Sequence, residues 1–312
     1  MKAAVEPWDS VALARALGRG RDVVSVAAVP SPYASSHPLM EIEVAYGDGG
    51  RVELVVKDLS AGALTPEARR AKTSSLYDPL REIEVYRDVL PRARLGTASV
   101  HAIVLDGSRR LLAIERINGR VLTEVGEIET WCGVASWLAD AHRRLGPLRS
   151  PRLVRWDAAL VAMWWERAAR LRPDRTVARV ADRRIEVAQR LLSTPVGLIH
   201  GELFASNVIV ASDGRVCPVD WELAGVGPQL LDLAALVAGR WSEGDREAIA
   251  REYRAAMPEA PAEEEFFEQL DLCRLQLAGQ LLAGSRSWTP PAEHAHDWLS
   301  DVRTIAPRLG LA

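Results

Sequence analysis

The segment HGELFASNVIV, residues 200–210, combines residue types that could carry out chemistry. Glu202 and Asn207 lie five positions apart, and Asp220 follows Asn207 after thirteen positions. Two apolar runs between Asn207 and Asp220 are joined through Ser-Asp-Gly at 212–214, which predicts a β-hairpin. A loop acid, an amide and a second carboxylate at the end of a hairpin offer the oxygen ligands that Mg²⁺ prefers. The pattern therefore predicts a magnesium site suited to a nucleoside triphosphate.

Protein kinases show the same spacing in the catalytic loop His-Arg-Asp-Leu-x-x-x-Asn, which a metal-binding Asp follows. Here Glu202 stands at the position of the catalytic Asp. Glutamate has the charge and nearly the pKa of aspartate, so the function of a general base is chemically retained. Its carboxylate extends one methylene further, and a displacement of about 1 Å can cost ~100-fold in rate. Three outcomes follow: a loop adjusted to Glu, an acceptor placed further away, or a binding protein without transfer activity.

Lys57 ends the strand-like run VELVVK and is the candidate for binding nucleotide phosphates. Glu82 lies 25 positions further on, in a segment with helical spacing, and could hold Lys57 in an ion pair. Glu84 is the competing partner, but it lies about 160° further round the helix. The register of the helix favours Glu82. The retention of Lys57, Asn207 and Asp220 together favours an active enzyme over a decayed one.

The elements that position these residues change character along the chain. Runs of strand length and β-branched composition occupy residues 22–29, 40–47, 51–59 and 101–117. Residues 78–93 between them predict a helix, which Pro91 is expected to end. This order predicts a small antiparallel sheet with one helix packed on it.

From about residue 118 helical patterns dominate, interrupted by the hairpin at 206–221. Apolar residues at helical spacing occupy 129–146, 156–171, 179–192 and 263–284. The sequence therefore predicts an α+β fold with two lobes joined near residues 115–120. The N-terminal lobe would span 1–117 and bind the nucleotide. The mainly α-helical C-terminal lobe, 118–312, would hold the catalytic loop, the metal site and the substrate pocket.

Composition narrows the class of protein. Of the 312 residues, 48% are hydrophobic and 26% are charged, and the net charge of -3 gives no basic excess for nucleic acid or an anionic membrane. The N-terminal segment has no signal-peptide core, and no later stretch approaches ~18 uncharged apolar residues. We therefore expect a cytoplasmic protein. The three cysteines form no CxxC pair, so neither a disulfide framework nor a zinc site is expected.

These residues resemble those of the aminoglycoside phosphotransferase and choline kinase-like family, small-molecule kinases with a protein-kinase-like fold. The resemblance covers roughly residues 20–240 in the order of the family. The motifs that carry it are HGELFASNVIV and VCPVDWELAGVGPQLLDLAAL, with support from VVKDL, REIEVYR, LLAIERINGR and WCGVASWLADAH. The final 70 or so residues match no motif, and in this family that region shapes the substrate pocket.

The resemblance implies a role for each matching residue. Lys57 would contact the α- and β-phosphates, with Glu82 as its partner. Glu202 would accept the proton of the substrate hydroxyl. Asn207 and Asp220 would bind magnesium.

Further positions follow from the same resemblance. Ser35 and Ser36 would cover the phosphates in place of a Gly-rich loop. Backbone groups of residues 115–118, among them those of Glu115 and Ile117, would contact the nucleotide base. His200 would brace the catalytic loop, and Asp232 would hold the loop backbone from the following helix.

The function expected is the ATP- or GTP-dependent, Mg²⁺-dependent phosphorylation of a hydroxyl on a sugar, an amino-alcohol or an antibiotic. Two alternatives stay open: a catalytically silent nucleotide-binding protein, and a nucleotidyltransferase that releases pyrophosphate. A kinase of protein substrates is disfavoured because no Ala-Pro-Glu element follows Asp220. The acceptor and the oligomeric state are not readable from the sequence.

Three other features have an ordinary structural interpretation. His142 is expected to pack or cap a helix rather than to bind a ligand. The pair Trp164 and Trp165 is expected in the core, although it could stack on a sugar or enclose a quaternary amine. The acidic run at 263–265 is expected to begin a helix, where carboxylates suit the helix dipole. The alternative is an acidic rim for a cationic substrate.

Overall fold

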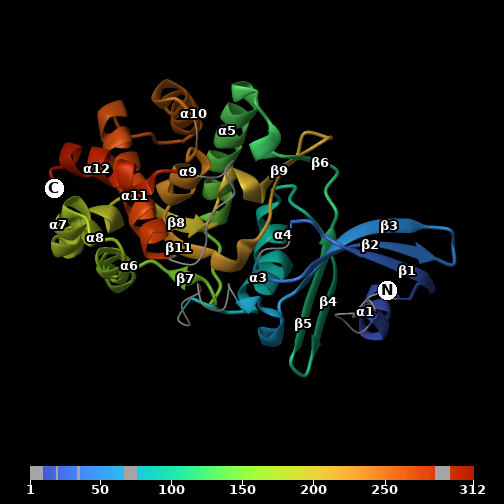
Figure 1. Ribbon diagram of the computed structural model, residues 1–312. Helices are drawn as coiled ribbons and strands as arrows, with labels where there is room; N and C mark the ends of the chain where they lie inside the picture. Colours follow the sequence, from blue (N-terminus) through green and yellow to red (C-terminus); the bar gives the residue numbers. More distant parts are fainter. Residues whose placement is uncertain (1–9, 19, 34–35, 67–75, 240, 285–295) are drawn as a thin grey trace.

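A five-stranded antiparallel sheet forms the N-terminal side of the molecule (Figure 1). The computed structural model describes residues 10–18, 20–33, 36–66, 76–239, 241–284 and 296–312. The strands are β1 (Val23–Pro30), β2 (Leu39–Tyr46), β3 (Arg51–Asp58), β4 (Val100–Asp106) and β5 (Arg109–Glu115), in the order β1-β2-β3-β5-β4. The predicted strands and their antiparallel arrangement are confirmed.

The central strand β3 carries Lys57. Its neighbours in register are Leu39 on β2 and Leu112 on β5. On β2, Ile42 and Val44 are buried while Glu43 between them is exposed, as period-two alternation requires. Because β3 lies in the middle of the sheet, strands on both sides fix the backbone at Lys57.

The helix that packs on this sheet continues through its proline. It consists of α3 (Arg81–Glu84), a π-helical turn (Val85–Val89) and α4 (Leu90–Ala93). The expectation that Pro91 ends the helix was wrong, since the helix continues to Ala93, and Arg94 in the left-handed conformation caps it. Pro91 lies in the first turn of α4, where a missing N–H costs little. The π-helical turn just before it changes the hydrogen-bond register of the helix.

The structure adds a helix to the N-terminal side, α1 (Ser10–Gly18), which contacts β1 and β4. Leu13 and Leu17 of α1 are buried against apolar residues of the sheet, among them Val44 and Leu54. This helix was not expected from the sequence. Short 3₁₀ turns occur at Ala61–Ala63, Leu122–Glu124, Ala205–Asn207 and Trp221–Leu223.

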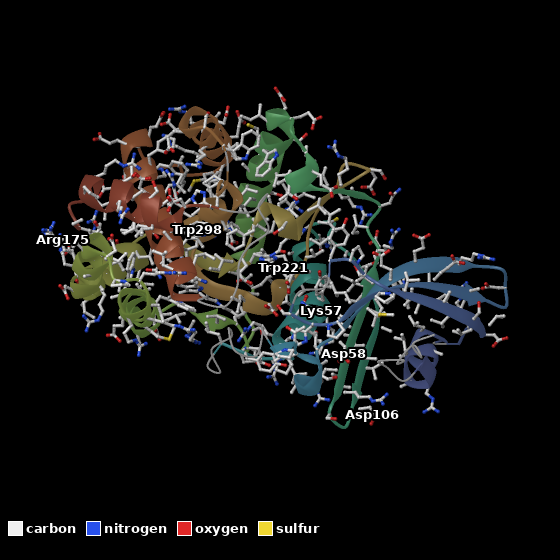
Figure 2. All side chains as sticks on the ribbon, in the orientation of Figure 1. Lys57, Asp58, Asp106, Arg175, Trp221 and Trp298 are labelled. Atoms are coloured by element: carbon white, nitrogen blue, oxygen red, sulfur yellow. The ribbon has the colours of Figure 1, made fainter. Side chains whose placement is uncertain are left out.

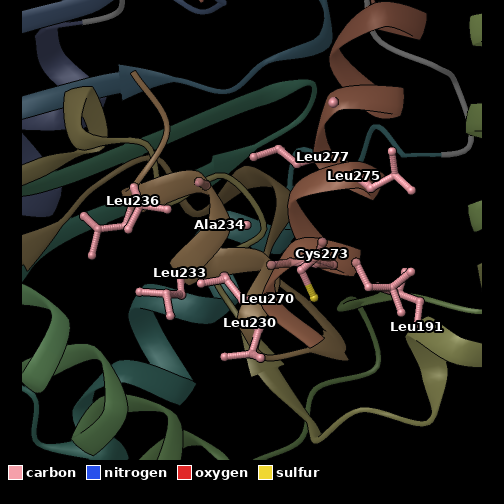
Figure 3. Packing of buried hydrophobic residues seen from close by; sticks show 14 of the residues in the cluster. Leu191, Leu230, Leu233, Ala234, Leu236, Leu270, Cys273, Leu275 and Leu277 are labelled. Atoms are coloured by element: carbon pink, nitrogen blue, oxygen red, sulfur yellow. The ribbon is translucent and has the colours of Figure 1, made fainter. Parts of the chain in front are cut away.

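Helices dominate the C-terminal side, as predicted (Figure 1). They are α5 (Ile128–Leu145), α6 (Ala158–Leu171), α7 (Arg175–Asp182), α8 (Arg184–Leu192), α9 (Leu230–Leu236), α10 (Glu243–Ala255), α11 (Glu263–Gly284) and α12 (Trp298–Arg308). The long helix α11 contacts α6, α8, α9 and α12. Figure 3 shows α9 and α11 packing through leucines and Cys273, so α11 is the centre of this core. None of the helices in the described ranges is both long and apolar enough to cross a bilayer.

Two small sheets position the candidate site within the helical part. One contains β6 (Gly119–Val121), β9 (Val208–Ala211) and β10 (Val216–Pro218), and the pairing of β9 with β10 confirms the predicted hairpin. The other contains β7 (Val154–Arg155), β11 (Gly225–Pro228) and β8 (Val196–Ile199), in that order. The segment 200–207 connects β8 to β9, and Asp220 lies between β10 and β11. Both loops therefore leave the ends of fixed strands.

Candidate active site

Lys57 joins the two sides of the molecule through two carboxylates. Its Nζ lies 2.7 Å from Oε2 of Glu82 and 2.5 Å from Oδ1 of Asp220, 163 positions away. Figure 2 shows Lys57 in the middle of the molecule, between the sheet and the helices. Burial alone would lower the pKa of Lys57. The charges of Asp220 and Glu82 raise it by more than burial lowers it, so the pKa lies well above its usual value. The lysine therefore keeps its proton.

Glu82 and Asp220 compete for this one ammonium group. The Glu82 side chain is 4% exposed and that of Asp220 is 25% exposed, so ionisation costs more at Glu82. Burial raises the pKa of Glu82 to about 7, although Lys57 acts in the opposite direction. The contact between Lys57 and Glu82 is the one that the helix register favours. The role of the pair in binding phosphates stays a prediction.

The neighbours of Glu82 on α3 hold the helix against the C-terminal side. Arg81 is 5% exposed and donates to the backbone carbonyls of Arg152, at 2.6 Å, and Glu222, at 2.5 Å. Glu84 accepts from the Ser150 hydroxyl at 2.6 Å and pairs with Arg152. Because Glu84 is bound to Ser150 and Arg152, Glu82 is the carboxylate of α3 that pairs with Lys57.

The loop that carries Glu202 is closed by hydrogen bonds of its own. Asn207 donates its side-chain amide to the carbonyl of Glu202 at 3.0 Å, and the Phe204 N–H reaches the same carbonyl at 2.8 Å. The Val219 N–H donates to the carbonyl of Asn207 at 2.9 Å. Since Val219 directly precedes Asp220, this bond brings the backbones of Asn207 and Asp220 close together. Because the amide nitrogen of Asn207 is used inside the loop, its oxygen is the atom left to face a cation.

Gly201 allows the loop to turn tightly beside the segment that follows Asp220. Its φ is +87°, and a Cβ there would lie 2.3 Å from the carbonyl oxygen of Leu223. Asp220 itself is one of two non-glycine residues with a positive φ in the described ranges, at 66°. Left-handed backbone costs a residue with a side chain roughly 1 kcal/mol, and Asp tolerates it better than most. The unusual backbone directs the carboxylate towards Lys57.

His200 braces this loop as a neutral imidazole. Its Nε2 lies 3.0 Å from the carbonyl of Val219, which can only accept, and its Nδ1 lies 3.3 Å from the N–H of Glu202, which can only donate. These partners require a proton on Nε2 and a lone pair on Nδ1. Burial lowers the pKa of His200, which is 1% exposed and packs against Trp221. Burial outweighs the charge of Asp232 and the hydrogen bond to Val219, which raise this pKa, and Nδ1 must be unprotonated to accept the Glu202 N–H.

Asp232 of α9 fixes the backbone at the start of the loop. Its two carboxylate oxygens accept the N–H groups of His200, at 2.7 Å, and Gly201, at 2.9 Å. His142 of α5 lies 3.1 Å from the same carboxylate, and its other ring nitrogen lies 2.8 Å from the Tyr253 hydroxyl of α10. Tyr253 was not predicted as a site residue from the sequence, and His142 was expected only to pack or to cap a helix. Three helices thus contribute to the position of one loop.

Of the residues expected at the nucleotide, Ser36 lies between β1 and β2, and Glu115 and Ile117 lie at the end of β5 and just after it. Ser35 lies outside the described residues. Ser36 is half-buried, and its carbonyl accepts from Thr65 at 3.1 Å. Glu115 ends β5 and pairs with Arg215 at 2.7 Å, while its N–H donates to Ser99. Ile117 lies between β5 and β6.

Asn207 and Asp220 offer oxygen ligands of the kind that magnesium prefers, but they are only two ligands. In the described part of the chain no group of three or more His, Cys, Asp and Glu side chains could hold a metal. Mg²⁺ is commonly held by one or two carboxylates together with waters and substrate phosphates rather than by a protein cage. One carboxylate and one amide oxygen therefore fit a magnesium ion that arrives with a nucleotide.

The antiparallel sheet joined to a mainly helical part is a protein-kinase-like fold. Residues 43–267, more than two thirds of the chain, match the phosphotransferase enzyme family, and the chain belongs to this family. A search of curated proteins finds no match.

Solved structures share the fold at low sequence identity. A microcompartment-associated aminopropanol kinase is 18% identical, with a TM-score of 0.63, over 97% of this chain and 96% of that one. Choline kinase LicA from Streptococcus pneumoniae is 13% identical, with a TM-score of 0.61, over 96% and 97%. A spectinomycin phosphotransferase in complex with ADP and spectinomycin is 12% identical, with a TM-score of 0.56, over 96% and 99%. At these identities the likeness shows the fold.

Proposed function

We propose that this protein transfers the γ-phosphoryl group of ATP or GTP to a hydroxyl of a small polar molecule, with Glu202 as the general base. The observation that carries the proposal is the contact of Lys57 with both Glu82 and Asp220, which joins the sheet to the loops around Glu202. The named functions of the structural neighbours, phosphorylation of aminopropanol, choline or spectinomycin, agree with a hydroxyl acceptor.

Each residue has a defined task in this proposal. Asn207 and Asp220 would hold Mg²⁺, which supplies positive charge to the phosphate oxygens when bound. Lys57 would bind the phosphates, and Glu82 would keep its ammonium group in place. Glu202 would accept the hydroxyl proton as the new O–P bond forms and the bond to the leaving nucleoside diphosphate breaks. Positioning and electrostatics supply most of the catalysis in such reactions.

A Glu at position 202, where the kinase catalytic loop has an Asp, is compatible with activity. The backbone carbonyl of Glu202 accepts two hydrogen bonds within the loop, and Asp232 holds the two preceding N–H groups. These contacts hold the loop at its backbone, and a loose transition state demands little deprotonation of the hydroxyl early in the reaction. A fixed backbone of this kind supports a working base over a decayed loop.

The test is nucleotide turnover by the purified protein with Mg²⁺, ATP or GTP, and a pool of sugars, amino-alcohols and antibiotics. The proposal expects ADP or GDP release that an acceptor stimulates. Release of pyrophosphate instead would indicate a nucleotidyltransferase. Binding of nucleotide without stimulated turnover by a much wider acceptor set would favour a silent nucleotide-binding protein. A cytoplasmic location and lobes of 1–117 and 118–312 stay predictions.

A further inference from the structure

The side chain of Phe204 joins the loop of Glu202 to α12, the C-terminal helix. Phe204 follows Glu202 by two positions, and its ring meets that of Trp298, the first residue of α12, edge to face. The ring centroids are 6.5 Å apart and the ring planes are inclined by 71°. Aromatic pairs favour this distance and this T-shaped geometry, so the contact is a specific one.

The backbone of Phe204 connects the proposed base to a proposed metal ligand. Its N–H donates to the carbonyl of Glu202, and its carbonyl accepts from the N–H of Asn207, both at 2.8 Å. The neighbouring residues Leu203 and Ala205 are buried in the core, whereas Phe204 is half-buried. Because both backbone groups of Phe204 are bonded within the loop, a displacement of its ring would shift Glu202 and Asn207 as well.

Trp298 has a defined setting at the start of α12, within the helical part of the molecule (Figure 2). The ring of His296 packs against it edge to face with a centroid separation of 4.3 Å. Nε2 of His296 lies 2.6 Å from Oδ2 of Asp301 on the first turn of α12. The side chain of Asp297 caps the helix by accepting from the Ser300 N–H at 2.9 Å. These contacts fix the indole where it meets the loop.

The helix that carries Trp298 is itself anchored in the C-terminal core. Three of its apolar residues are at most 1% exposed: Val302, Ile305 and Ala306. The helix contacts α7 and α11, and Arg303 pairs with Asp174 of α7 at 2.7 Å. A helix held in this way can restrain a loop, because it does not move with the loop.

We infer, on the basis of the proposed function, that Trp298 is a positioning residue for Glu202 and acts through Phe204. The contacts run from the indole of Trp298 to the Phe204 ring, and from the Phe204 N–H to the carbonyl of Glu202. Trp298 supplies no charge and no proton to the reaction. Its loss should therefore lower kcat by displacing the base, without weakening acceptor binding. The C-terminal segment, which matches no sequence motif, thereby gains a role in the reaction.

The first test needs no substrate and measures amide hydrogen exchange in the unsubstituted protein, Trp298→Phe and Trp298→Ala. Trp298→Ala should speed exchange at Phe204 and Asn207 about three- to tenfold, because the loop opens more readily once the ring contact is lost. His200 and Gly201, whose N–H groups are held from α9, are internal references and should not change. Trp298→Phe keeps an aromatic ring and should restore most of the protection. Unchanged exchange at Phe204 and Asn207 in Trp298→Ala, or equal increases at all four sites, would overturn the inference.

The second test measures kcat and KM for whichever acceptor of the pool is turned over. Trp298→Ala should lower kcat about tenfold or more and leave the acceptor KM within about threefold, since a displaced base affects the reaction and not the binding. Phe204→Leu should act similarly, and the double variant should lose little more than either single variant. Phe267→Ala of α11 is the matched control, because Phe267 is also half-buried but pairs with Phe266 at 5.3 Å, and it should leave kcat unchanged.

The outcomes separate this inference from the proposed function. Additive losses of Trp298→Ala and Phe204→Leu, or a rise in acceptor KM at unchanged kcat, would overturn the inference and leave the proposed function standing. The absence of turnover with any acceptor would contradict the proposed function instead. The exchange measurement would then still decide whether Trp298 holds the loop.

Discussion

The carboxylate of Asp220 lies 2.5 Å from the ammonium group of Lys57, although the two residues lie in different halves of the molecule. Lys57 is on the central strand of the N-terminal sheet, and Asp220 follows the β9–β10 hairpin. With Glu82 they form one cation between two carboxylates. This arrangement links the stability of the fold to the residues proposed to bind the nucleotide.

Replacement of Lys57 by Met should lower the free energy of unfolding at pH 8 by about 3 kcal/mol, because it leaves buried Glu82 without its partner. The double variant Lys57→Met with Glu82→Gln should be more stable than Lys57→Met alone. Arg51→Met on the same strand is the control and should change stability little, since the Arg51 side chain is 71% exposed. Urea unfolding measures all three, and a double variant no more stable than Lys57→Met alone would contradict the coupling.

A pair of glycine substitutions tests how tightly the loop is built. Gly201→Ala should unfold the loop or abolish turnover, because its Cβ would lie 2.3 Å from the Leu223 carbonyl oxygen. Gly214 in the hairpin has a similar φ of +85° but nothing within 4 Å of an added Cβ. Gly214→Ala should therefore cost only the left-handed conformation, roughly 1 kcal/mol. Equal losses in the two variants, compared by thermal unfolding and nucleotide turnover, would argue against the close approach.

The carboxylate of Asp232 should control the rate rather than nucleotide affinity. Asp232→Asn places an amide donor where two N–H groups and His142 now meet a carboxylate, so kcat should fall at least about tenfold. The dissociation constant for ATP with Mg²⁺ should stay within about twofold, a change smaller than one net hydrogen bond. Tyr253→Phe, which removes the partner of His142, should lower kcat less.

Asp174→Asn is a matched control for Asp232→Asn. Asp174 caps α7 next to Arg175, which Figure 2 shows at the far side of the helical part from Lys57. Asparagine is a good N-cap residue, so this variant should keep both stability and turnover. Steady-state kinetics and equilibrium binding make the comparison, and a fall in ATP affinity alone for Asp232→Asn would refute a positioning role.

Acid should destabilise the protein through His200. Burial lowers the pKa of His200 below the ordinary value of 6.5, so the unfolded chain takes up a proton more readily than the folded one. The contribution of His200 to stability is present above pH 6.5 and is lost as the pH falls through 6.5 and below, by up to ~1.4 kcal/mol per pH unit. His200→Gln should reduce this slope, measured by urea unfolding between pH 5 and 8. His101→Gln, at a half-buried position, should reduce it less.

Much of this site could be predicted because its signals are local. The spacing of Glu202, Asn207 and Asp220 depends on one loop and one hairpin, and the face of α3 that carries Glu82 follows from 3.6 residues per turn. The contacts of His142 with Tyr253 and of Arg81 with Glu222 join residues 111 and 141 positions apart, and no local pattern encodes them.

Other features depended on tertiary context. The π-helical turn lets the helix pass Pro91, and propensity alone predicts a stop there. The side chains of Trp164 and Trp165 lie only 100° apart around α6. The N–H of Trp165 donates to Gln276 of α11, whereas that of Trp164 has no acceptor among the described residues. The acidic run at 263–265 begins α11 as expected, and Glu263 pairs with Arg251, which does not favour a rim of free carboxylates.

The central claim is that Glu202 is the base of a phosphotransfer reaction. The most direct measurement is acceptor-stimulated release of ADP or GDP with Mg²⁺ by the unsubstituted protein, Glu202→Gln, Glu202→Asp and Asp220→Ala. The account predicts stimulated turnover that Glu202→Gln lowers by at least about 100-fold and that Asp220→Ala abolishes, with partial activity in Glu202→Asp. Stimulated turnover that Glu202→Gln leaves unchanged would contradict it.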